Sequence, residues 1–144
     1  MAEQRFWDDV RVDDLLPVLE KLPTTRQLVQ YAGASGDFYE IHYDKDFAFN
    51  TGLDGVIVHG ALKSAFLGQL VTDWMGEKGT IKRLVVQYRG MDVPNQQLTC
   101  TGRVSRKYIE DGHHLVDCEI WIKNPDDKKT TPGSATVILP QRAR

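Results

Sequence analysis

The stretch HGALKSAFLGQLVTDW, residues 59–74, decides the fold. Leu62, Phe66 and Leu70 recur with helical spacing on one side, and Leu67, Val71 and Trp74 make a second apolar stripe. A helix that is apolar on more than one side is usually surrounded by protein. Residues 60–74 are therefore predicted to form a long helix enclosed by other elements.

Strand-like segments follow this helix through most of the second half. They alternate apolar and polar residues for part of their length, and turn-forming residues separate them. Neighbouring strands with short links are expected to be antiparallel. A buried helix followed by such strands predicts an α+β domain with the sheet wrapped around the helix, and the open sheet edges favour a dimer. The segments are Thr80–Met91, Leu98–Tyr108, His114–Lys123 and Thr130–Pro140.

The first half of the sequence predicts shorter helices and one strand. A strand is expected within Leu15–Leu22, and a helix over Arg26–Ala34 that begins at Thr24 or Thr25 and ends at Ser35-Gly36. A second helix, Lys45–Asn50, is expected to begin at Asp44.

Composition and charge limit the classes of protein to which this chain can belong. The 144 residues are 41% hydrophobic and 26% charged with a net charge of −2, which predicts one domain, 1–144, and gives no reason for a nucleic-acid or membrane partner. The N-terminus is acidic and does not resemble a signal peptide. Cys100 and Cys118 lack CxxC spacing and are interpreted as buried reduced thiols, so a cytoplasmic location is expected. No metal-ligand spacing is found, so no metal is expected.

The densest group of reactive side chains lies in GASGDFYEIHYD, residues 33–44. Glycines at 33 and 36 permit a tight turn before Asp37, and a loop can bring His42 back toward that carboxylate. A neighbouring carboxylate and imidazole can pass protons to and from a shared water near neutral pH. The alternative is a turn aspartate and a solvated histidine, and spacing alone leaves both open.

A second group, Val58-His59-Gly60-Ala61, stands at the start of the long helix. The free N–H groups and the positive end of the helix dipole gather there, so a carbonyl oxygen that gains charge could be stabilised. The alternative is a glycine needed for packing and a histidine that caps the helix.

Together these residues resemble the MaoC-like hydratase/dehydratase family, which includes the (R)-specific enoyl-CoA hydratases. The family pattern is roughly S-G-D-x-N-P-I-H-x-D, followed later by a [VA]-H-G turn. The resemblance rests on Tyr31–Asp44, Phe47-Ala48, Gly52 and Ile57–Gly60, and it is continuous over about Thr24–Trp74.

This resemblance implies a dimeric hot-dog fold and reversible hydration of a trans-2-enoyl thioester to the 3-hydroxyacyl thioester. Asp37 and His42 match the catalytic pair that holds the water. Gly60 matches the residue whose N–H binds the thioester carbonyl, and His59 and Tyr39 are expected to line the substrate site. No cofactor is implied, because the coenzyme A or acyl-carrier arm belongs to the substrate.

One departure concerns Tyr39-Glu40, which stand where the family has Asn-Pro. A phenol and a carboxylate change the size and polarity of the pocket, which favours a bulky or polar acyl group. Two alternatives remain. A hot-dog thioesterase usually draws its carboxylate from the central helix, which here offers only Ser64, Gln69 and Asp73. The chain could also be the active subunit of a heteromeric dehydratase.

Overall fold

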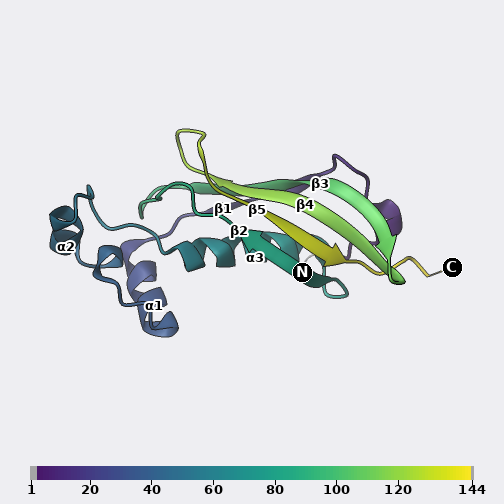
Figure 1. The fold of residues 1–144 in the computed structure, drawn as a ribbon, viewed down its shortest axis with the longest axis horizontal. Coiled ribbons are helices and arrows are strands. Elements are labelled where there is room, and N and C mark those ends of the chain that lie inside the picture. Colours follow the sequence, from purple (N-terminus) through teal and green to yellow (C-terminus); the bar gives the residue numbers. More distant parts are fainter. Residues whose placement is uncertain (1–2, 144) are drawn as a thin grey trace.

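The long helix α3 forms the centre of the fold. The computed structural model describes residues 3–143 and places α3 at Gly60–Met75, one residue longer than predicted. A five-stranded sheet covers one side of α3, and the shorter helices project beyond the end of the sheet (Figure 1). The buried helix residues are Leu62, Lys63, Phe66, Leu67, Leu70, Val71, Trp74 and Met75.

All strand pairs are antiparallel, in the order β1-β3-β4-β5-β2. Alternate residues of the central strands, such as Val104 and Ile120, point into a core shared with α3. The prediction of an α+β hot-dog fold, a sheet wrapped around one helix, is confirmed. The strands are β1 (Leu15–Lys21), β2 (Thr80–Val86), β3 (Leu98–Glu110), β4 (His113–Lys123) and β5 (Lys129–Ile138).

The predicted pairing of the first two long strands is wrong. β2 pairs with β5 at the edge of the sheet and does not lie beside β3, although the two are neighbours in sequence. β2 also ends at Val86 and not at Met91. The amides of Arg89 and Gly90 both donate to Thr130 O at 2.9 Å, so the regular ladder stops there. Residues 91–97 then lead from the edge strand β2 to β3, which lies toward the opposite edge of the sheet.

The helices of the first half begin and end where local signals predict. α1 (Thr25–Ser35) is capped by Thr24, whose Oγ1 accepts from Gln27 N at 3.1 Å. Gly36 ends it with φ 79°, in the left-handed region that favours glycine. α2 (Lys45–Asn50) is capped by Asp44. Short 3-10 turns lie at Trp7–Asp9 and Glu40–His42.

Cys100 and Cys118 are buried and free, as predicted. Burial raises the pKa of each thiol to about 12, so neither is a nucleophile at neutral pH. Among residues 3–143, no helix has the length and apolar character that crossing a membrane requires. The prediction of one domain over 1–144 includes residues 1, 2 and 144, which lie outside the described residues.

Candidate active site

Asp37 is held just after the C-terminus of α1. Its backbone N–H donates to Ser35 Oγ at 3.1 Å, and its Oδ1 accepts from Tyr39 N at 3.4 Å. These contacts follow from the turn at Gly36, which redirects the chain out of the helix. The other carboxylate oxygen, Oδ2, is left to face His42.

His42 ends the 3-10 turn and is oriented by a backbone carbonyl. Its Nδ1 lies 2.8 Å from Ile57 O. A carbonyl only accepts, so Nδ1 carries the hydrogen, and Nε2 bears the lone pair of the neutral ring. The second ring nitrogen is therefore set up as a proton acceptor, and it points toward Asp37.

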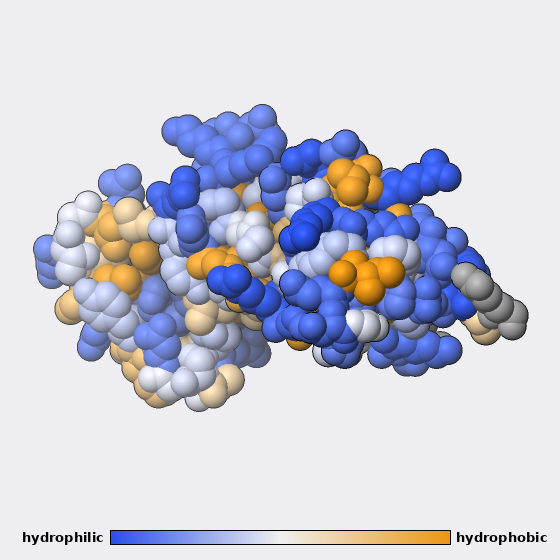
Figure 2. Space-filling model, turned by 45° about the vertical axis from the view of Figure 1, so that its right-hand side comes forward, coloured by the Kyte–Doolittle hydropathy of each residue, from blue (hydrophilic) through white to orange (hydrophobic). Residues whose placement is uncertain are grey.

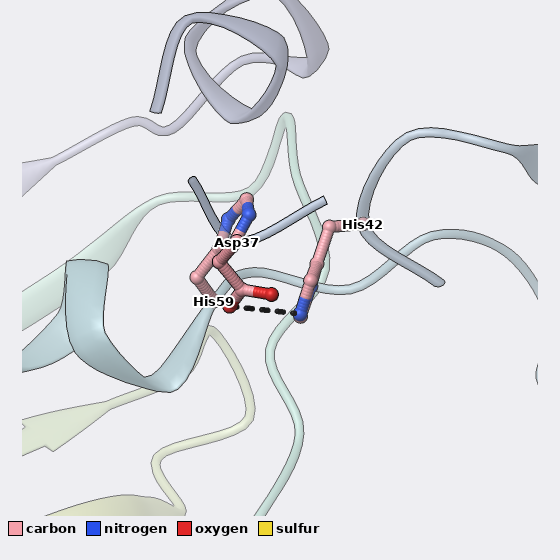
Figure 3. Close-up of side chains that lie close together, drawn as sticks. All are labelled: Asp37, His42 and His59. Carbon is pink, nitrogen blue, oxygen red and sulfur yellow. Dashed lines mark ion pairs between the residues drawn. The ribbon is translucent and has the colours of Figure 1, made fainter. Parts of the chain in front are cut away.

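The two predicted acid/base residues come together. His42 Nε2 and Asp37 Oδ2 are 3.9 Å apart, with side-chain exposures of 9% and 46% (Figure 3). This separation is too long for a direct hydrogen bond, but a single water oxygen can lie about 2.8 Å from both atoms. The arrangement can hold one water between a base and a carboxylate.

His59 lies behind this pair. Its ring is 0% exposed, stacks on His42 with centroids 3.8 Å apart, and meets Tyr31 edge-on at 4.8 Å. Among residues 3–143, neither ring nitrogen has a hydrogen-bond partner. Burial lowers the pKa of His59, with a smaller contribution from the neighbouring His42, so the ring is neutral near pH 7. The structure places His59 against His42 and out of solvent, and it makes no side-chain cap on α3.

These three residues also satisfy a distance condition for a metal site, since one ligand atom of each lies within 4.8 Å of the others. However, the rings of His42 and His59 are stacked with an interplanar angle of only 22°. A metal ion lies close to the ring plane of each imidazole that binds it, and two stacked rings with centroids 3.8 Å apart have no common point in both planes within bonding distance. The geometry therefore fits a shared water better than a metal ion.

Gly60 begins α3 beneath the ring of Tyr88. A Cβ atom at Gly60 would lie 2.9 Å from Tyr88 Cε2, closer than real Cβ atoms come. Tyr88 is fixed there by its hydroxyl, 2.6 Å from Ser64 Oγ. A side chain at position 60 would therefore have to displace the Tyr88 ring, while the backbone N–H still belongs to the unpaired first turn of the helix. The packing and carbonyl-binding explanations are compatible.

Tyr39 is exposed at the opening of the site. Its ring meets His42 edge-on at 6.2 Å and Phe47 at 5.9 Å. The Tyr39 ring therefore lies beside His42 and remains open to solvent.

Three features around these residues were not predicted from the sequence: the carbonyl of Ile57, the ring of Tyr88, and a buried ion pair between Lys63 and Asp92. A lysine inside a helix predicted to be buried was the available signal for the ion pair. The carbonyl and the ring depend on contacts distant in sequence.

A separate cavity of about 510 Å³ lies toward the other end of α3, beside Leu70, Asp73 and Trp74, and does not include the acid/base pair.

A protein-family model described as "MaoC like domain" matches residues 5–120. The chain therefore belongs to the MaoC-like domain family. Among curated proteins it is similar to the fatty acid synthase subunit beta of Saccharomyces cerevisiae, at 28% identity over 120 residues. This match covers 82% of the chain and 6% of the yeast subunit, so the chain spans only a small part of that relative.

Solved structures share the fold. An (R)-hydratase from Pseudomonas aeruginosa in the unliganded form superposes with a TM-score of 0.84 at 20% identity, covering 94% of this chain and 86% of that one. The ChsH1-ChsH2 complex from Mycobacterium tuberculosis contains a chain that matches with a TM-score of 0.79 at 22% identity, covering 90% and 98%.

Proposed function

We propose that this protein is a hydro-lyase that reversibly hydrates a trans-2-enoyl thioester to the 3-hydroxyacyl thioester. The observation that carries the proposal is the 3.9 Å gap between His42 Nε2 and Asp37 Oδ2, which suits one shared water. Membership of the MaoC-like family supports the same chemistry.

In the proposed reaction the thioester carbonyl makes C3 of the enoyl group electrophilic. The hydroxyl of the held water bonds to C3, and the Asp37–His42 pair accepts the remaining proton. The pair then delivers one proton to C2, so the elements of one water molecule are added and no cofactor is consumed. Dehydration is the same sequence in reverse.

Negative charge grows on the thioester oxygen as C3 is attacked. The N–H of Gly60, at the positive end of α3, is proposed to bind that oxygen. His59 has no exposed surface and is proposed to act by supporting the ring of His42. Tyr39 is proposed to contact the acyl group.

The acyl group is proposed to be bulky or polar. Tyr39 is exposed beside His42, and the carboxylate of Glu40 follows in the same exposed turn. Other exposed aromatic residues of this region, Phe38, Tyr43 and Phe49, supply further apolar surface. Hydrophobic residues gather on the visible face at the end of the molecule that carries α1 and α2 (Figure 2).

The active form is proposed to be a dimer, of like chains or with a related hot-dog subunit. Of the strands in the described residues, β2 pairs with β5 alone, which leaves its outer edge open. A second subunit could pair with that edge and cover exposed Tyr88 and Met91. The two buried free thiols are typical of a reducing compartment, which supports a cytoplasmic location.

An assay with enoyl-CoA substrates of different sizes tests the proposal. Hydration removes the absorbance of the conjugated double bond without releasing thiol. Release of free coenzyme A with the double bond intact would instead identify a thioesterase. Activity that appears only when a second hot-dog subunit is added would identify the chain as one half of a heteromer. No conversion under any of these conditions would refute the proposal.

A further inference from the structure

A buried ion pair lies beside the proposed site and takes no part in the chemistry described above. Lys63 Nζ is 3.0 Å from Asp92 Oδ2, and the two side chains are only 3% and 1% exposed. Removing two charges from water is costly, and apolar side chains of similar size often stabilise a fold as well. Stability alone is therefore a weak explanation for this pair.

The pair joins three elements. Lys63 stands in the first turn of α3 and donates a second hydrogen bond, of 3.0 Å, to Gly90 O. Asp92 Oδ2 also accepts from Thr130 Oγ1 at 2.6 Å. The start of α3, the segment after β2 and the start of β5 are thus tied together at one carboxylate oxygen.

The backbone of Asp92 extends this connection to the proposed site. Asp92 O accepts from Val58 N at 2.8 Å. The adjacent residue, Ile57, donates its N–H to Ile41 O at 3.1 Å and accepts from His42 Nδ1 at 2.8 Å. Two residues further along the chain from Val58, Gly60 begins α3. Residues 57–60 therefore carry both the carbonyl that orients His42 and the N–H proposed to bind the thioester oxygen.

We infer that Lys63 and Asp92 are positioning residues that hold residues 57–60 in place from both sides. Lys63 anchors the first turn of α3, and Asp92 anchors the segment leading into it. The orientation of His42 and the position of the Gly60 N–H then depend on one buried contact. This inference rests on the proposed function for its kinetic consequence, but the effect on the His42 ring can be measured without substrate.

Single substitutions are unsuitable as a test. Asp92 Oδ1 is buried and has no hydrogen-bond partner in the described part of the chain, so loss of Lys63 alone would leave an uncompensated carboxylate and could unfold the protein. The double variant Lys63→Met/Asp92→Asn removes both charges together and keeps an oxygen that can accept from Thr130. Its melting temperature is expected to stay near that of the wild type.

The kinetic readout is kcat against KM at a temperature where all variants are folded. The double variant is expected to lose about 10- to 100-fold in kcat, because small displacements of reacting groups are costly. KM should change by less than about threefold, since the loss concerns groups that act in the transition state. The control is Val116→Ala, a fully buried position of β4 in register with Lys107 and Val137, which lowers stability away from the site. Its kcat should be unchanged.

The second readout is the ¹⁵N spectrum of the labelled histidine rings, with the His42→Ala spectrum as the assignment control. Wild-type His42 should show protonated Nδ1, and the double variant a mixture of the two neutral tautomers. A folded double variant with wild-type kcat would overturn the inference, as would an equal loss in Val116→Ala. If the wild type hydrates no thioester, the proposed function fails, and the ¹⁵N spectrum alone tests the positioning role of Lys63 and Asp92. A His42 signal that is the same in the double variant as in the wild type would then refute that role.

Discussion

The ring of His42 lies almost flat on the ring of His59, with centroids 3.8 Å apart and planes inclined by 22°. The inner ring has no exposed surface and no hydrogen-bond partner, and its lowered pKa keeps it neutral. His59 is therefore a neutral, buried ring against which the ring of His42 packs.

Burial of His59 predicts a loss of stability in acid. The folded state holds this ring with a lowered pKa, whereas the unfolded chain titrates it near the ordinary value of about 6.5. The contribution of His59 is therefore fully present above about pH 6.5 and is lost as the pH falls below that value, with a slope of at most about 1.4 kcal/mol per pH unit. Urea unfolding between pH 5 and 8 measures this. The His59→Phe variant should show a shallower slope over that range, and an identical slope would contradict the prediction.

Loss of either member of the acid/base pair should abolish most of the hydration activity. Asp37→Asn and His42→Ala are each expected to lower kcat by about two to four orders of magnitude, the range for positioned proton-transfer groups. Asp37 is half-exposed, so its variant should keep the wild-type melting temperature. Initial rates of absorbance loss with an enoyl-CoA give the measurement.

The matched control for the charge change is Asp46→Asn, an exposed carboxylate in the first turn of α2. It should retain near wild-type kcat. Comparable rates in Asp37→Asn and Asp46→Asn would exclude Asp37 from the chemistry.

The contact between Gly60 and Tyr88 predicts a rescue. Gly60→Ala places a Cβ 2.9 Å from the Tyr88 ring and should lower both melting temperature and kcat, because the ring must shift to make room. Since Tyr88 is exposed, the loss of stability should stay below the about 1–3 kcal/mol of an overpacked core. Removing the ring in Gly60→Ala/Tyr88→Ala relieves the contact while keeping the backbone N–H. The double variant should therefore match Tyr88→Ala alone in kcat and in stability. If the alanine at position 60 remains equally harmful without the ring, the crowding explanation is wrong.

Tyr39 is expected to set acyl selectivity. Its ring is exposed and lies edge-on to His42, so an aromatic or bulky acyl group can pack against it. Tyr39→Ala should raise KM about 3- to 10-fold for such thioesters, as expected for the loss of one aromatic contact, and should leave crotonyl-CoA nearly unaffected. Tyr39→Phe keeps the ring and should behave like the wild type. An equal change for short and bulky substrates would argue against selectivity at this position.

The elements that the sequence predicted well are those with local causes. Thr24, Asp44 and Gly36 act within one helical turn, and they placed the ends of the short helices to within about a residue. The motif around Asp37 and His42 likewise lies within one short segment. The position of β2 beside β5 depends instead on packing across the whole sheet, which no nearby residue signals.

The residues that hold the site in place were harder to predict from the sequence for the same reason. Lys63 and Asp92 are 29 residues apart in sequence, and Tyr88 reaches Ser64 from 24 residues away. Each could be recognised as unusual by type, a lysine in an apolar helix or an aromatic residue after a strand. Which residues Lys63 and Tyr88 contact depends on the path of residues 87–97 between β2 and β3. That path follows from the strand order, which was not predicted.

Because Ile57 and Gly60 are three residues apart, one short segment carries both the carbonyl that orients His42 and the N–H proposed to bind the thioester oxygen. The residues that would meet the acyl group, such as Tyr39, stand on the separate projection formed by α1 and α2. Asp37 and His42 lie in this same projection, so the acid/base pair and the residue proposed to set acyl selectivity share one stretch of backbone. A redesign for other acyl groups would therefore have to change single side chains such as Tyr39 and keep the backbone that positions Asp37 and His42.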